Sequence, residues 1–77
     1  MSTREDTQRA RKGILKEINE LIEQRRGLMA RQKKLKAGKP KRGQEALVNQ
    51  CIRRYGSEIA EINRRIEMLE ANLEGLA

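Results

Sequence analysis

The chain has 77 residues, of which 38% are charged, and its formal net charge is +7. This length allows one small domain, whose core would need help from disulfides, a metal ion or association with another chain. One cysteine and no histidine exclude an internal disulfide and argue against a structural zinc site. Association or an unusually regular helical arrangement remains.

The N-terminal stretch is polar and begins a helix. The first residues, MSTREDTQRARKG, are too polar for a secretory signal, and no uncharged run approaches the ~20 apolar residues of a membrane span. With the single cysteine, they predict a cytoplasmic, intracellular protein. The stretch Ser2-Thr3-Arg4-Glu5 predicts a capping box, in which Ser2 and Glu5 satisfy free backbone N–H groups.

A first amphipathic helix is expected over about residues 4–36. Its seam positions are spaced alternately by four and three residues, and two of them are polar. A second apolar stripe runs beside this seam at seven-residue spacing, so the apolar face is wider than a two-stranded contact requires. The seam comprises Ile14, Ile18, Leu21, Arg25, Leu28, Gln32 and Leu35, and the second stripe comprises Leu15, Ile22 and Met29.

A basic loop is expected at residues 37–43. Gly38 is suited to the left-handed position after a helix, and Pro40 cannot continue the helix. The stretch KKLKAGKPKRG, residues 33–43, has a net charge of +6, against +3 for residues 1–32 and −2 for residues 44–77. Its basic side chains are the candidate binding site: Lys33, Lys34, Lys36, Lys39, Lys41 and Arg42. The first three also complement the dipole of the preceding helix.

A second helix is expected over about residues 44–75. Nine successive seam positions are filled without exception: Val48, Ile52, Tyr55, Ile59, Ile62, Ile66, Leu69, Leu73 and Leu76. This heptad pattern is typical of a coiled-coil helix. The stretch Tyr55-Gly56-Ser57 could kink the helix, but the continuous seam favours a single one. The short loop makes the two helices antiparallel neighbours, so the predicted fold is an all-α, two-helix coiled-coil hairpin.

The seam positions also predict a register, in which the numbers of partner residues sum to 80. Ile14 then lies opposite Ile66, Ile18 opposite Ile62, Leu21 opposite Ile59, Leu28 opposite Ile52 and Gln32 opposite Val48. Arg25 lies opposite Tyr55, where its guanidinium would stack on the ring. Leu69, Leu73 and Leu76 are left uncovered. With Leu15, Ile22 and Met29, they form a predicted oligomer or partner interface. A homodimeric four-helix bundle would bury this surface, and docking onto a different protein is the alternative.

Few residues offer catalytic chemistry. Without histidine the usual near-neutral general base is missing. Cys51 lies beside the seam and is expected to be a small, partly buried apolar residue. The glutamates alternate with basic residues at helical spacing, as surface ion pairs do. The stretch AGKPKRG lacks the spacing of a phosphate-binding loop. We therefore expect no enzyme activity, no cofactor and no metal site.

Binding is the function class that the charge pattern favours. A concentrated positive field is typical of proteins that bind nucleic acid, a nucleoprotein or an acidic protein surface. The alternative is that the loop is basic only because a small helical protein needs charge to stay soluble. Tyr55 is the single aromatic residue, and in the seam it would leave no ring for bases to stack on. Any contact with nucleic acid would then be directed at the phosphate backbone and would weaken as salt rises. The predicted topology resembles that of small helical-hairpin dimers of the plasmid RNA-binding Rop type; this resemblance implies a fold only.

Two other hypotheses use the same features. One is a small inhibitor or adaptor, of the kind that phages and mobile elements encode, which clamps a host protein through the apolar surface or the basic loop. The other is a structural subunit of an assembly. Like nucleic-acid binding, both functions require no catalytic residues. The sequence is therefore compatible with all three functions.

Overall fold

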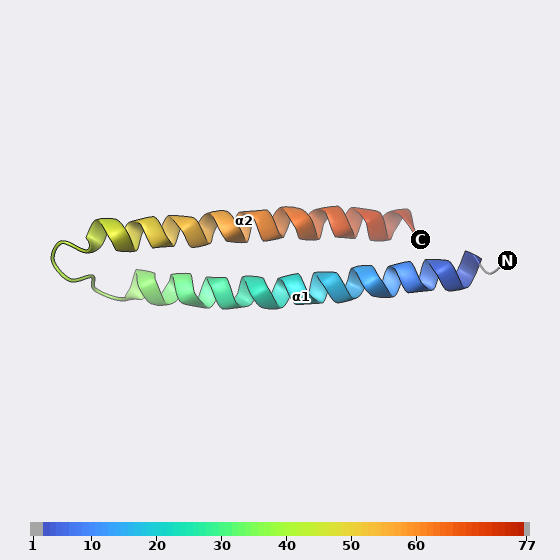
Figure 1. Cartoon of the computed structure of the whole chain (residues 1–77), viewed down its shortest axis with the longest axis horizontal. Coiled ribbons are helices and arrows are strands. Elements are labelled where there is room, and N and C mark those ends of the chain that lie inside the picture. Colours follow the sequence, from blue (N-terminus) through green and yellow to red (C-terminus); the bar gives the residue numbers. More distant parts are fainter. Residues whose placement is uncertain (1–2, 77) are drawn as a thin grey trace.

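Two long helices make up nearly all of the protein. The structure, a computed structural model, describes residues 3–76. Helix α1 spans Thr3–Ala37 and helix α2 spans Glu45–Gly75. They run antiparallel, side by side, and form a narrow rod with principal extents of 66 × 15 × 12 Å (Figure 1). The predicted hairpin and its approximate boundaries are confirmed, and α2 continues through Gly56 as one helix. The expected capping box includes Ser2, which lies outside the described residues.

The loop between the helices closes differently from the expectation. The N–H of Gly38 still donates to the carbonyl of Lys34 over 3.1 Å, which continues the helical pattern at the end of α1. Gly38 does not have a positive φ; the glycine that does is Gly43, at 91°. The N–H of Gln44 donates to the carbonyl of Lys41 over 2.9 Å, which closes a turn with Gly43 at its third position. This is the pattern of a type II turn, which requires glycine there.

The two predicted seams face each other. Every seam position from Ile14 to Leu35 in α1, from Val48 to Leu73 in α2, and Leu76 directly after α2, is buried or half-buried. The most buried residues are Ile18, Ile66 and Leu69, and they form one apolar cluster near the open end of the hairpin. Four half-buried residues pack against this cluster: Ile14, Leu21, Ile22 and Ile62. The heptad pattern therefore identified the contact face of both helices.

The predicted register is wrong by about one heptad (about seven residues). Arg25 was expected opposite Tyr55, but its Nη1 donates to Oδ1 of Asn63 over 2.7 Å. Gln32 was expected opposite Val48, but its Nε2 donates to the carbonyl of Ile52 over 3.1 Å, and it lies 3.4 Å from where a Cβ on Gly56 would be. The helices do not end level. In Figure 1, α2 begins beyond the end of α1 at the loop, and α1 extends past α2 at the open end.

The shift corrects two further predictions. Leu69, expected to be uncovered, is only 4% exposed because α1 supplies Ile18 for it to pack against. Leu73 and Leu76 are half-buried rather than fully exposed. The predicted stacking of Arg25 on Tyr55 does not form, since the guanidinium of Arg25 is bonded further along α2, to Asn63.

Candidate nucleic-acid interface

The positive charge is concentrated in one half of the rod. We define the tip half as residues 28–59, which include the loop and the ends of the two helices beside it. It contains nine lysines and arginines and two glutamates, a net charge of +7. The remaining residues contain nine basic and nine acidic side chains, a net charge of zero. The whole net charge of the protein is therefore located at one end of a 66 Å rod.

The basic side chains of the tip half are exposed and have no acidic partner. All nine are exposed: Arg31, Lys33, Lys34, Lys36, Lys39, Lys41, Arg42, Arg53 and Arg54. Two ion pairs, of Arg26 with Glu23 and of Arg65 with Glu17, lie outside the tip half. One cause is local: α1 has no acidic residue after Glu23. The positive field is thus available to a ligand.

The six predicted binding residues all lie in this half. Lys33, Lys34 and Lys36 are in the last turns of α1, and Lys39, Lys41 and Arg42 are in the loop. The antiparallel packing also brings Arg31, Arg53 and Arg54 to the same end. In the sequence, the doublet Arg53-Arg54 is a possible extension of the basic track, although interleaved glutamates favour an ordinary solvated face, and Arg31 is not among the predicted residues. A signal for them was present, because residues at similar distances on either side of a hairpin loop lie at the same level of the rod.

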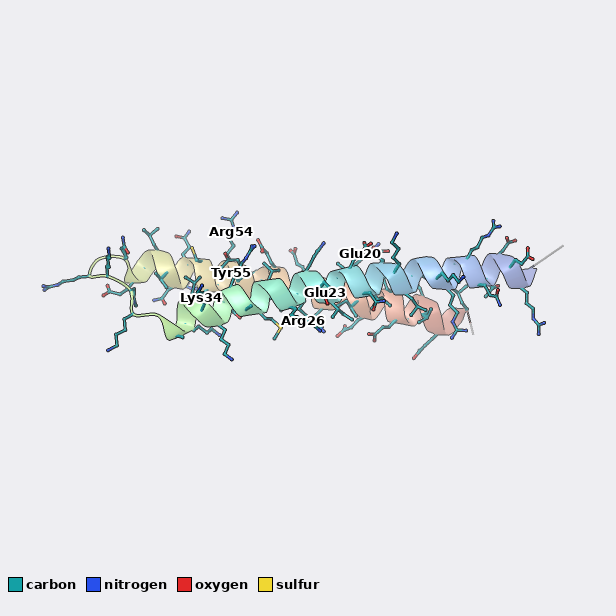
Figure 2. All side chains as sticks on the ribbon, turned by 90° about the horizontal axis from the view of Figure 1, so that it is seen from below. Glu20, Glu23, Arg26, Lys34, Arg54 and Tyr55 are labelled. Carbon is teal, nitrogen blue, oxygen red and sulfur yellow. The ribbon has the colours of Figure 1, made fainter. Side chains whose placement is uncertain are left out.

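Shallow hollows flank the seam within the tip half. On one side, Arg31 and Lys34 line a hollow of about 250 Å³ with Leu35 of α1 and Tyr55 of α2. Another hollow, of about 330 Å³, is formed by α1 alone and includes Met29, Lys33 and Lys36. In the view of Figure 2, Lys34 and Tyr55 lie between the two ribbons, whereas Arg54 projects away from the rod. Basic side chains therefore line both hollows.

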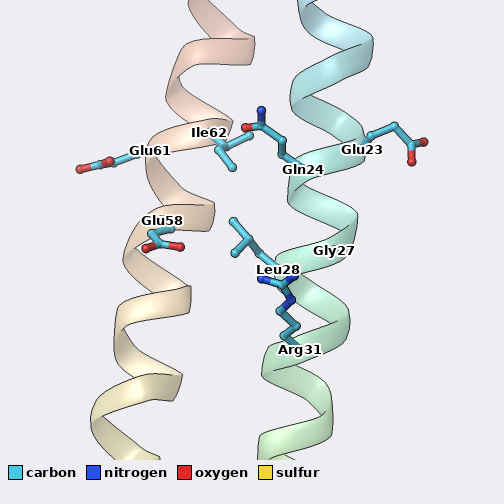
Figure 3. A pocket seen from close by; sticks show the side chains of 8 residues that line it. All are labelled: Glu23, Gln24, Gly27, Leu28, Arg31, Glu58, Glu61 and Ile62. Atoms are coloured by element: carbon cyan, nitrogen blue, oxygen red, sulfur yellow. The ribbon is translucent and has the colours of Figure 1, made fainter.

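A larger groove near the middle of the rod is lined by three glutamates and one basic residue, Arg31. Leu28 and Ile62 lie between the helices there, and the lining includes Glu23, Glu58 and Glu61 (Figure 3). In Figure 3, the carboxylates of Glu23 and Glu61 point away from the gap, in opposite directions. They do not converge on a common point, as a general acid and base acting on one substrate would. Among the described residues, no group of three or more potential ligands is placed to hold a metal ion.

The second apolar stripe lies largely on the surface. Leu15 is 43% exposed and Met29 is 52% exposed, while Ile22, between them, packs against the core cluster. Of the predicted interface residues on α2, Leu69 is part of the core, and Leu73 and Leu76 are half-buried. The exposed apolar surface of the predicted interface is therefore centred on α1.

Cys51 is exposed, not partly buried as expected. It lies on the flank of α2, beside the seam but outside the contact with α1. Its thiol thus faces solvent.

Comparison of the chain with protein-family models, with curated proteins and with solved structures finds no match. Within the described residues, neither helix is both long and apolar enough to cross a membrane.

Proposed function

We propose that this protein is a non-enzymatic nucleic-acid-binding protein whose tip half contacts the phosphate backbone. The observation that carries the proposal is the net charge of +7 within residues 28–59, all of whose basic side chains are exposed. Because these cations are not paired with carboxylates of the protein, binding a phosphate does not require an existing ion pair to break. The favourable Coulomb energy is then available for the ligand.

Counterion release is the expected driving force. Each phosphate that a lysine or arginine neutralises releases a condensed cation from the nucleic acid, so affinity falls steeply as salt rises. Lysine dominates the loop, and it binds phosphate as a point charge without selecting a base. None of the hollows in the tip half is enclosed enough to read a sequence of bases. We therefore expect binding with little sequence specificity.

We further propose that the protein acts as a homodimer. One hairpin exposes 6700 Å². A compact monomer of 8.9 kDa exposes about 4,800 Å², so the excess is about 1,900 Å². Two chains that each bury this excess would form an interface of about 3,800 Å², within the range of obligate dimers. Among the residues that the structure describes, only three are buried, which also favours association.

The stripe of Leu15, Ile22 and Met29 is the surface we assign to this contact. Packing it against a second copy gives a four-helix bundle, in which α1 of each chain has the wider apolar face that bundles use. The two partners in this contact are then two copies of the same chain. If a different protein covers the stripe instead, the adaptor or inhibitor hypothesis replaces the dimer, and the purified chain is a monomer.

Fluorescence anisotropy tests the nucleic-acid proposal. A labelled single strand and a labelled duplex are titrated with the protein at several salt concentrations. We expect a logarithmic salt slope equivalent to several phosphate contacts, with about 0.7 to 0.9 per contact. Binding that does not change with salt would overturn the proposal. Dissociation constants weaker than about 100 µM at low salt would do so as well, because even non-specific complexes reach about 1–100 µM at physiological salt.

A further inference from the structure

Tyr55 is the one aromatic residue of the chain, and it lies inside the basic half of the rod. It occupies one position of the second seam, and all the other positions of that seam hold aliphatic residues. The ring is half-buried and is not covered by Arg25, which bonds to Asn63 instead. Part of the Tyr55 side chain therefore remains open to a ligand.

The surroundings of this ring combine apolar and cationic groups. Tyr55 and Leu35 supply an aromatic and an aliphatic wall, and Arg31 and Lys34 add two exposed cations from α1. We call this the Tyr55 hollow. Its volume, about 250 Å³, is below the ~300–1,000 Å³ of typical small-molecule sites. It is thus suited to one planar ring with negative groups beside it rather than to a whole cofactor.

We propose that the Tyr55 hollow binds one unpaired nucleobase, stacked against Tyr55, while the adjoining phosphates contact Arg31 and Lys34. This inference rests on the proposed nucleic-acid function and deepens it by naming the ligand class. In a duplex, both faces of each base are covered by its neighbours, so only an unpaired base can enter the hollow. The tip half therefore prefers single-stranded segments to continuous duplex.

The same residue provides the readout. Because the chain has no tryptophan and a single tyrosine, its intrinsic fluorescence reports on Tyr55 alone. The probes are a thymidine single strand about 12 nucleotides long, within the usual site size, and a fully abasic strand of equal length. The abasic strand has the same phosphates without bases. We expect the thymidine strand to quench the fluorescence and to bind about fivefold more tightly, as one stacked base allows.

Two variants distinguish stacking on the Tyr55 ring from the apolar packing of residue 55 in the seam. Tyr55→Phe keeps the aromatic face and should retain the preference for the thymidine strand. Tyr55→Leu keeps the apolar seam position and should bind the two strands equally, with unchanged affinity for the abasic one. If Tyr55→Leu retains the preference, the Tyr55 hollow is not a base site.

The titrations give different results if the base site is wrong and if nucleic-acid binding as a whole is wrong. Equal binding of both strands by the natural protein, without quenching, would overturn the base site and leave backbone binding intact. If neither strand binds at low salt, both the proposed function and this inference are wrong.

Discussion

Leu69 and Leu47 are both leucines in α2, yet Leu69 is 4% exposed and Leu47 is 63% exposed. Leu69 is on the seam, and Leu47 lies just beside it. The heptad pattern predicts this difference in face. It does not by itself fix the register, because a seam repeats every seven residues and registers one heptad apart both bring the two seams together. The choice depends on how the loop positions the helix ends.

Leu69→Ala tests this burial. Removing a buried leucine side chain should lower the free energy of unfolding by about 2–3 kcal/mol. Leu47→Ala is the matched control, and we expect a change within about 0.5 kcal/mol because its side chain is already in water. Urea unfolding followed by circular dichroism measures both values. Equal effects would mean that Leu69 is not covered by α1.

At the scale of the elements, local signals predicted the helices better than the loop. The apolar periodicity, the terminal lysines and Pro40 placed both helices to within a few residues. The loop contains two glycines, Gly38 and Gly43, and either could have taken the left-handed conformation. The hydrogen bond from Gln44 to Lys41 makes it Gly43, and this turn sets where α2 begins. Such a bond cannot be read from residue types alone.

Two glycine substitutions of opposite expected sign test this assignment. Gly43→Ala should lower the free energy of unfolding by about 1–2 kcal/mol, since alanine is strained at a φ of 91°. Gly27→Ala should raise it by up to about 1 kcal/mol, because the helical position is open, with no neighbour within 4 Å of an added Cβ. Thermal unfolding of the two variants compares them directly. A neutral Gly43→Ala would rule out the positive φ at this residue.

At the scale of the whole molecule, packing adds what the linear charge pattern omits. The run at residues 33–43 was visible in the sequence, but Arg31, Arg53 and Arg54 become part of the same basic surface only once the hairpin forms. The excess of surface over a compact monomer is likewise a property of the folded rod. We propose a partner for each feature: a polyanion for the tip half and a second chain for the stripe on α1.

The dimer is tested with two methionines of similar exposure. Met29, in the stripe, is 52% exposed, and Met68, on α2, is 58% exposed. Met29→Glu would bury a charge in the proposed contact, so we expect it to convert the dimer to a monomer of 8.9 kDa. Met68→Glu should leave the dimer intact. Sedimentation equilibrium measures the masses. A natural protein that is a stable, helical monomer would exclude the homodimer.

We propose that the tip half, and not positive charge in general, binds nucleic acid. The most direct measurement compares two triple variants of equal net charge by anisotropy against one labelled single strand. One is Lys39→Gln, Lys41→Gln and Arg42→Gln in the loop. The other is Arg9→Gln, Arg11→Gln and Lys12→Gln in α1, where all three side chains are exposed at the far end of the rod. We expect the loop variant to reduce the salt slope by about 2, as the loss of up to three phosphate contacts implies, and to weaken binding strongly. The α1 variant should keep the natural slope. Equal losses in the two variants would show that binding follows net charge alone and would contradict the assignment of the site to the tip half.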